Sequence, residues 1–122
     1  LAASRDAGAT WDFVDRGLHA AYARAVALLD GSVFLSVSEG PGGRRSAVYR
    51  AALTLDEPFV RCTDGLPEWF GTNVDTGCLV AAGGMVALGT DGGSRYASAD
   101  GGGRWDVVAG DLPPITCLAA AG

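Results

Sequence analysis

The chain has 122 residues, of which 48% are hydrophobic, and a formal net charge of −5. This length allows one modest core or a few repeat units. All nine basic residues are arginines and form no basic stripe among the 14 acidic residues, which argues against nucleic acid as a partner. No run of 18 apolar residues occurs, so the sequence predicts no membrane-spanning segment and no membrane partner.

Short strands joined by tight turns are expected along the whole chain, because most of the 19 glycines fall in clusters between apolar runs. The predicted strands lie at 25–29, 33–38, 47–53 and 59–62, then at 78–82, 85–89, 95–98 and 105–108. The small side chains of 25–29 and 78–82 suggest strands that are crowded on both faces. The sequence therefore predicts an all-β fold.

An eight-residue window recurs at 11–18, 59–66 and 105–112, at offsets of 48 and 46 residues. Each window begins with an aromatic residue, has Val or Cys fourth and ends with Leu. A period near 47 residues with four strands per unit is typical of a propeller blade. Residues 1–122 are thus expected to be one β-propeller fragment: 1–14 ends a preceding blade, 25–62 and 78–108 are two complete blades, and 115–122 begins the next.

A second pattern, Ser-x-Asp-x-Gly-x-x-Trp, precedes the first and third windows, and its Trp is the first residue of each window. The middle window lacks this pattern. Its residues are Ser4, Asp6, Gly8, Trp11, Ser98, Asp100, Gly102 and Trp105. The carboxylate can accept hydrogen bonds from turn amides, and Gly can adopt a positive φ. Each Trp can bury its ring between blade layers.

This pattern resembles the Asp-box of bacterial BNR-repeat propellers, a group that includes sialidase-like proteins. In that family Asp-boxes are fold elements that lie away from the substrate-binding face. The resemblance therefore implies that Asp6 and Asp100 are structural rather than catalytic.

Propeller ligands usually contact the loops from the fourth strand to the next first strand and from the second strand to the third, here 17–24, 64–77, 111–114, 39–46 and 91–94. The longest, 64–77, contains Glu68, Trp69, Asn73 and Asp75, and the matching connection of the previous blade contains Tyr22 and Arg24. An exposed Trp beside carboxylates and an amide can hold a glycan or a peptide. In the alternative, Trp69 and Phe70 fold back onto the blades. His19, the sole histidine, is expected at the surface.

A sialidase-type site needs an arginine triad, a Tyr nucleophile, a Glu and an acid/base Asp. None of these can be matched to a position here, so no catalytic residue is assigned. The expected function is a non-catalytic binding or scaffold segment that takes a glycan or protein ligand on its inter-blade loops. The alternative is part of a sialidase-like exo-glycoside hydrolase whose catalytic residues lie mostly elsewhere. The remaining blades of the propeller, or further chains in a homo-oligomer, are the expected partners.

The three cysteines, Cys62, Cys78 and Cys117, lack the spacing of a metal site or a disulfide framework and are expected to be free and buried. No acidic series matches a calcium loop, and no glycine cluster carries the Lys of a phosphate loop, so neither a metal nor a cofactor is expected. No signal peptide is visible, but the chain starts at Leu1, which leaves cytoplasmic and secreted locations open.

Overall fold

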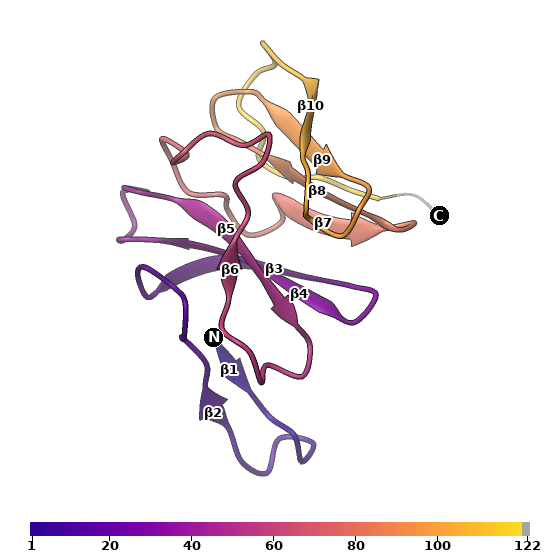
Figure 1. The fold of residues 1–122 in the computed structure, drawn as a ribbon. Helices are drawn as coiled ribbons and strands as arrows, with labels where there is room; N and C mark the ends of the chain where they lie inside the picture. The colour runs from indigo at the N-terminus through magenta and orange to yellow at the C-terminus, as the bar shows by residue number, and fades with distance from the viewer. Residues whose placement is uncertain (121–122) are drawn as a thin grey trace.

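The computed structural model describes residues 1–120, and within them the chain forms strands and turns only, which confirms the all-β class. Three antiparallel sheets follow one another along the chain (Figure 1). The N-terminal hairpin contains β1 (Ala2–Ala3) and β2 (Asp12–Phe13). The first sheet contains β3 (Tyr22–Leu29), β4 (Ser32–Ser38), β5 (Ala47–Ala52) and β6 (Val60–Arg61). The second sheet contains β7 (Leu79–Ala82), β8 (Met85–Gly89), β9 (Arg95–Ser98) and β10 (Asp106–Ala109).

The strands of both large sheets lie where the sequence predicts them, with ends shifted by at most three residues. Each sheet is a meander in which every strand pairs with the next one along the chain. The largest shift is at β3, which starts at Tyr22 because that residue still pairs with Ser38 of β4. Glycine-containing turns set these ends, since Asp30 and Gly31 both have positive φ between β3 and β4.

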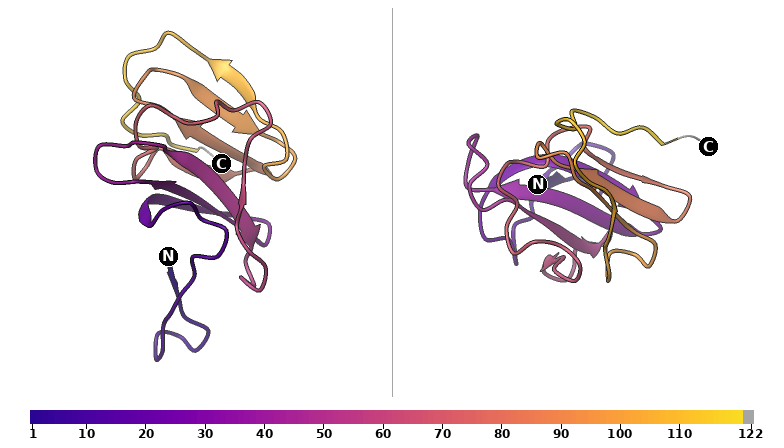
Figure 2. Two further views of the ribbon diagram at one scale, coloured as in Figure 1. Left: turned by 60° about the vertical axis from the view of Figure 1, so that its left-hand side comes forward. Right: turned by 90° about the horizontal axis from the view of Figure 1, so that it is seen from above.

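The two large sheets pack face to face, and the N-terminal hairpin extends from the opposite side of the first sheet (Figure 2). Because side chains alternate across a strand, β4 supplies both faces: Phe34 points to the second sheet, whereas Val33 and Leu35 point away from it. The core between the sheets contains Ala25, Ala27, Leu29, Phe34, Val48, Cys62, Phe70, Val74, Cys78, Leu79, Val86, Leu88 and Trp105. The first sheet is therefore the central layer.

Strand β3 is crowded on one face only, contrary to the expectation for its small residues. Ala25 and Ala27 are buried against β7, which explains why small side chains are needed there. Val26 and Leu28 lie on the other face, where they are 54% and 59% exposed. No strand in the described residues covers that face of β3.

The described part of the predicted final strand, 115–120, runs beside the second sheet without joining a ladder. Ile115 N–H donates to Thr90 O over 3.1 Å, and Leu118 N–H donates to Gly77 O over 2.8 Å. These two isolated bonds attach the segment to the second sheet. A β-ladder would need regular pairing with a neighbouring strand, which the segment does not have among the described residues. Residues 121–122 of this prediction lie outside the described residues.

The recurring windows make the same backbone contact at both junctions. Phe59 N–H donates to Arg16 O over 2.8 Å, and Trp105 N–H donates to Asp64 O over 2.9 Å. Arg16 and Asp64 hold the same position in the window, as do Phe59 and Trp105. The sequence repeat is therefore a repeat of contacts between successive units.

Glycine is required at the residue that follows each of these carbonyls. Gly17 and Gly65 have φ values of 88° and 84°. A Cβ at Gly17 would lie 2.2 Å from Phe59 O, and one at Gly65 would lie 1.8 Å from Trp105 O. Only glycine allows this close approach of two backbones. In the third window Asp111 stands at this position, with a φ of 55°.

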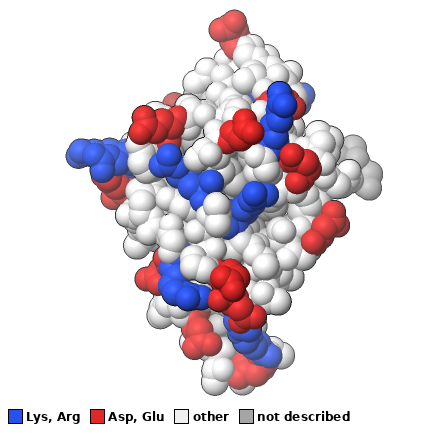
Figure 3. Space-filling model, in the orientation of Figure 1, with Lys and Arg blue, Asp and Glu red and all other residues white. Residues whose placement is uncertain are grey.

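The surface of the described residues carries no large field of one sign on the face in view, since acidic and basic side chains are interspersed (Figure 3). Five ion pairs join arginines to carboxylates within 4 Å, and all of them are solvent-accessible. Along residues 1–120 no helix is long and apolar enough to cross a membrane.

Candidate functional site

The first Ser-x-Asp-x-Gly-x-x-Trp segment is a turn closed by its own side chains. Ser4 Oγ donates to Asp6 Oδ1 over 2.9 Å and accepts from Gly8 N–H over 2.7 Å. Asp6 accepts from the Thr10 amide over 2.8 Å and from the Thr10 hydroxyl over 2.6 Å. The Trp11 indole N–H donates to Gly8 O over 3.2 Å. Every residue type in the pattern therefore has a local hydrogen-bonding role.

The second such segment makes the same bonds apart from that of the Thr10 hydroxyl, because Arg104 stands at the corresponding position. Ser98 Oγ donates to Asp100 Oδ1 over 2.8 Å and accepts from Gly102 N–H over 2.9 Å. Asp100 accepts from the Arg104 amide over 3.0 Å, and the Trp105 indole donates to Gly102 O over 3.1 Å. Both carboxylates are thus engaged inside their own turns, as the structural interpretation of the pattern expects.

The two tryptophans differ in burial, although their turns are alike. Trp105 is 1% exposed and meets the Phe34 ring edge-on, with centroids 6.4 Å apart. Trp11 is 63% exposed. The expectation that both rings are buried is wrong for Trp11, because no sheet of the described residues lies where the first sheet lies against Trp105.

The turn hydrogen bonds lower the pKa of both aspartates. Hydrogen bonds from the side chain and then the backbone of Thr10 lower the pKa of Asp6 from 3.8 to about 2. The backbone amide of Arg104 lowers the pKa of Asp100. A depressed folded-state pKa stabilises the fold above the unfolded value, and the contribution disappears as pH falls through the folded value.

We therefore expect the stability advantage of the wild type over Asp6→Asn to be constant near neutral pH and to shrink between about pH 4 and about pH 2. Denaturant unfolding at several pH values measures it. Asp12→Asn removes a carboxylate from the same hairpin that makes no hydrogen bond among the described contacts, so it is the matched control. An advantage that persists or grows toward pH 2 would contradict this origin of the stability.

Four of the six predicted ligand-face residues line one polar hollow, of about 370 Å³. Its lining consists of Tyr22, Arg24, Pro41, Gly42, Thr72, Asn73, Asp75 and Asp91. These residues come from the start of β3, the β4–β5 loop, the 64–77 connection and the β8–β9 loop. The volume lies at the lower end of the range for small-molecule sites.

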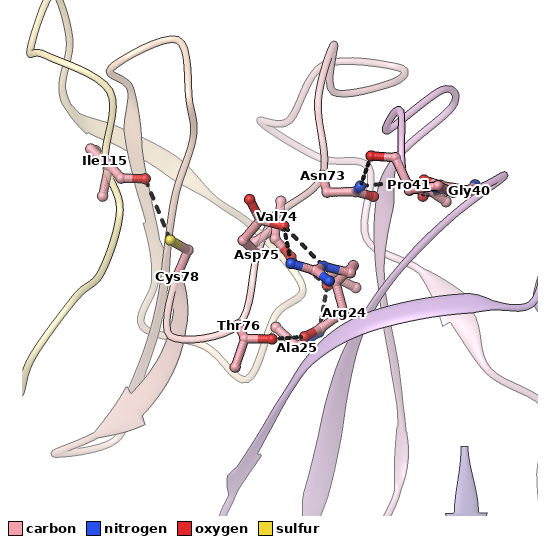
Figure 4. Close-up of polar contacts among 12 residues, drawn as sticks. Arg24, Ala25, Gly40, Pro41, Asn73, Val74, Asp75, Thr76, Cys78 and Ile115 are labelled. Carbon is pink, nitrogen blue, oxygen red and sulfur yellow. Dashed lines mark hydrogen bonds and ion pairs between the residues drawn. The ribbon is translucent and has the colours of Figure 1, made fainter.

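Two of the lining residues, Arg24 and Asp75, form an ion pair (Figure 4). Arg24 Nε and Nη2 each lie 3.0 Å from Asp75 Oδ1. The hydrogen bond that Arg24 donates to Asp75, together with the negative charge of Asp75, raises the pKa of Arg24. The Arg24 guanidinium lies 5.9 Å from the centroid of the Tyr22 ring, and Thr76 Oγ1 donates to Arg24 O over 2.6 Å. Both charged side chains remain partly exposed, so the pair adds little stability but holds donors and acceptors side by side.

Asn73 links the loops around the hollow. Its Nδ2 lies 3.3 Å from Gly40 O and 3.2 Å from Pro41 O, so its amide group donates to the tip of the β4–β5 loop (Figure 4). A Cβ at Gly43 would lie 2.5 Å from Asn73 N, which indicates close backbone contact between loop and connection. Contacts between the β4–β5 loop and the 64–77 connection therefore hold the side chains of the hollow in place.

Trp69 folds back onto the first sheet, as the alternative interpretation expects. Its ring packs against the hydrophobic cluster on the face of the first sheet that points away from the second sheet, which includes Val33 and Leu35. The Arg61 guanidinium lies 4.4 Å from the ring centroid. Trp69 also lines a second hollow, which shares Thr72 and Asp91 with the first. Glu68 is exposed and lines neither of these two hollows. The structure therefore brings Trp69 beside the polar hollow and leaves Glu68 outside it.

The environment of His19 could not be predicted from the sequence, because no local residue pattern indicates its contacts. His19 is exposed, yet Nε2 lies 2.7 Å from Arg45 O and Nδ1 lies 2.6 Å from Tyr49 Oη. A carbonyl only accepts, so Nε2 carries a hydrogen and donates to Arg45 O; in the neutral ring, Nδ1 then accepts from the tyrosine hydroxyl. The His19 ring also lies 4.7 Å from the Trp69 ring. His19 thus joins β5 to the 64–77 connection.

Asp91 and Thr72 are the two polar side chains of the hollow that the sequence did not single out. Their loops were expected on this face, and the Asp91-Gly92-Gly93 turn was the available signal.

Among the described residues no group of three or more His, Cys, Asp or Glu side chains could hold a metal ion. The three cysteines are free thiols; Cys62 and Cys78 are buried, whereas Cys117 is exposed, contrary to expectation. Burial raises the pKa of Cys62 to about 11.

These features define an all-β protein of antiparallel meanders, with a polar hollow where loops of both large sheets meet. No protein-family model matches the chain, and no curated protein matches it significantly.

Proposed function

We propose that the chain is a segment of an Asp-box, BNR-type β-propeller that binds a glycan or protein ligand at the polar hollow without catalysing a reaction. Three features of the fold support the propeller assignment. Both large sheets have the same four-stranded order, their first strands β3 and β7 lie against each other, and the two Ser-x-Asp turns have matching hydrogen bonds. The bacterial origin stays an implication of the resemblance.

The single observation that carries the ligand proposal is the convergence of Tyr22, Arg24, Asn73 and Asp75 on one hollow. Arg24 uses two N–H groups on Asp75, which leaves further donors on the same planar group. Donors beside carboxylate acceptors are suited to hydroxyl or peptide groups. Trp69 borders the adjoining hollow, where its ring edge can contact an apolar surface of the same ligand.

A sialidase-like exo-glycoside hydrolase remains the second candidate, on one specific observation. Tyr22, Arg24, Asp75 and Asp91 supply residue types that such a site uses, and all of them line the same hollow. However, Arg24 is the one arginine of that lining, whereas a carboxylate clamp of this kind needs three. In this second proposal the remaining catalytic groups come from other blades.

A glycan-binding screen combined with a fluorogenic sialoside assay tests the proposal. We expect saturable glycan or protein binding that Arg24→Ala weakens by about 10- to 100-fold, because a hydrogen bond to a charged group is removed. Trp69→Ala should weaken it less. Arg44→Ala removes an arginine that pairs with Glu39 and does not line the hollow, so binding should be unchanged.

Two results would overturn this proposal. Sialoside turnover by the chain would replace binding with hydrolysis as the function. Binding that is equally sensitive to Arg24→Ala and Arg44→Ala, or absent with glycans and with protein partners sought by crosslinking, would remove the hollow from consideration.

A further inference from the structure

The polar hollow continues into the second hollow, which Trp69 borders. The second hollow has a volume of about 390 Å³, and the two hollows share Thr72 and Asp91. All residues that line them lie between positions 22 and 96, in the two large sheets, their hairpin loops and the connection between the sheets. The two hollows therefore form one groove at the junction of the sheets, with Asp91 between its halves.

The second hollow differs from the polar hollow in chemical character. Its walls include four largely apolar side chains, those of Pro67, Trp69, Phe70 and Tyr96. The Phe70 ring is buried and meets the Tyr96 ring edge-on, with centroids 5.9 Å apart. Trp69 and Tyr96 remain partly exposed, so their surfaces are accessible to a ligand. A group that fills this half of the groove should therefore be largely apolar.

Asp91 gives the groove an excess of negative charge. Within residues 1–120 the exposed Asp91 carboxylate forms no ion pair, whereas Arg24 and Asp75 pair with each other. The groove contains one basic and two acidic side chains, so its formal net charge is −1. The whole chain has the same sign of charge, at −5. Charge complementarity therefore disfavours an anionic ligand and favours a cationic group beside Asp91.

Hydrogen bonds of the β8–β9 loop fix the position of Asp91. Thr90 N–H donates to Ser94 O over 3.0 Å, and Gly93 N–H donates to Thr90 O over 3.1 Å. Leu112 N–H donates to Gly93 O over 3.1 Å, which attaches the loop to the segment that follows β10. The backbone around Asp91 is thus ordered before any ligand binds, so binding need not order this loop.

We propose that the groove binds a basic segment of a protein partner, with a Lys or Arg side chain in the second hollow and its charged group at Asp91. Lysine and arginine combine an apolar stem with a cationic end, which matches an apolar wall that ends at a carboxylate. A sugar would place hydroxyl groups against Pro67 and Tyr96, where few partners are available to them. Arg24, in the polar hollow, can donate to main-chain carbonyls of the same segment. The proposal rests on the proposed function and selects a protein over a glycan as the ligand.

Fluorescence polarisation with short labelled peptides tests this proposal. The central residue of the peptides is lysine, acetyl-lysine or glutamate, and the flanking residues are randomised among uncharged types. Acetyl-lysine keeps the apolar stem of lysine and removes its charge. At low ionic strength we expect the lysine peptides to bind about 3- to 10-fold more tightly than the acetyl-lysine peptides, because they gain one partly exposed ion pair. The glutamate peptides should bind most weakly, and added salt should reduce the preference for lysine.

Three variants locate the origin of the preference. Asp91→Asn removes the charge at nearly constant size, so lysine and acetyl-lysine peptides should bind equally. Asp64→Asn is the matched control, because Asp64 is an exposed aspartate of the 64–77 connection that lines neither hollow. It removes the same formal charge and should keep the preference for lysine. Arg24→Ala should weaken all the peptides alike. Far-UV circular dichroism verifies that each variant is folded.

The outcomes separate this proposal from the proposed function. Peptide binding without a preference for lysine would overturn the assignment of a basic segment, as would a preference that Asp91→Asn and Asp64→Asn reduce equally. Glycan binding that depends on Arg24, in the absence of peptide binding, would overturn this proposal and leave the polar hollow as a ligand site. Absence of both glycan and peptide binding would overturn both proposals.

Discussion

Replacing Trp105 with alanine is expected to lower the free energy of unfolding by about 3–5 kcal/mol, because the change removes a large aromatic side chain from a packed core. Trp105 is 1% exposed and lies between the two large sheets, with its ring edge-on to Phe34. The loss also leaves the Gly102 carbonyl without its indole donor in a buried turn. Domains of this size are typically stable by about 5–15 kcal/mol, so the variant should lose a large share of its stability.

The repeat itself supplies the control for this experiment. Trp11→Ala makes the same chemical change in a turn with the same hydrogen bonds, but at a side chain that is 63% exposed. We expect it to cost about 1 kcal/mol or less. Equilibrium unfolding in urea, at concentrations where the chain is monomeric, measures both variants. Equal losses for Trp105→Ala and Trp11→Ala would mean that the two sheets do not pack as described.

Replacing Gly65 with alanine is expected to cost about 3–5 kcal/mol, the sum of backbone strain and a steric clash. Its φ of 84° is unfavourable for a residue with a Cβ. That Cβ would lie 1.8 Å from Trp105 O, a backbone atom immediately before β10 of the second sheet. Relief requires the two backbones to separate, which would break the hydrogen bond from Trp105 N–H to Asp64 O.

Gly31→Ala separates the two contributions. Gly31 has a φ of 80°, and a Cβ there would meet no atom within 4 Å, so the substitution adds strain without a clash. We expect it to cost about 1–2 kcal/mol. The difference between the two variants in urea unfolding measures the close approach at Gly65. If Gly65→Ala costs no more than Gly31→Ala, the backbones are not held in contact.

The same junction connects stability to the candidate site. The 64–77 connection begins at the Gly65 contact, and Phe70 N–H donates to Ser46 O over 2.8 Å further along. Ser36 Oγ then donates to Val74 O over 2.7 Å, and Val74 belongs to the core between the two large sheets. Asp75 follows immediately and pairs with Arg24. A variant that loosens the junction should therefore also disturb the polar hollow, which is why Arg24→Ala is the more specific test of binding.

The sequence alone was sufficient for the features whose hydrogen bonds are local or that depend on short apolar runs. The strands of both large sheets follow from apolar runs between glycine-containing turns. The two Ser-x-Asp turns follow from eight adjacent residues, because each bond within them spans at most four positions. The grouping of Tyr22, Arg24, Asn73 and Asp75 also followed, since corresponding connections of a repeated unit lie on the same side of the sheets.

Tertiary structure decided which of these similar segments are covered. Trp11 and Trp105 occupy the same local turn, yet only Trp105 has a neighbouring sheet against its ring. Likewise, the bridge of His19 between Tyr49 and Arg45 joins residues 26 to 30 positions apart, and no local pattern marks it. Burial and long-range hydrogen bonds depend on which distant segments of the chain pack against a residue. A sequence pattern of a few residues specifies its own turn, but it does not specify which sheet packs against that turn.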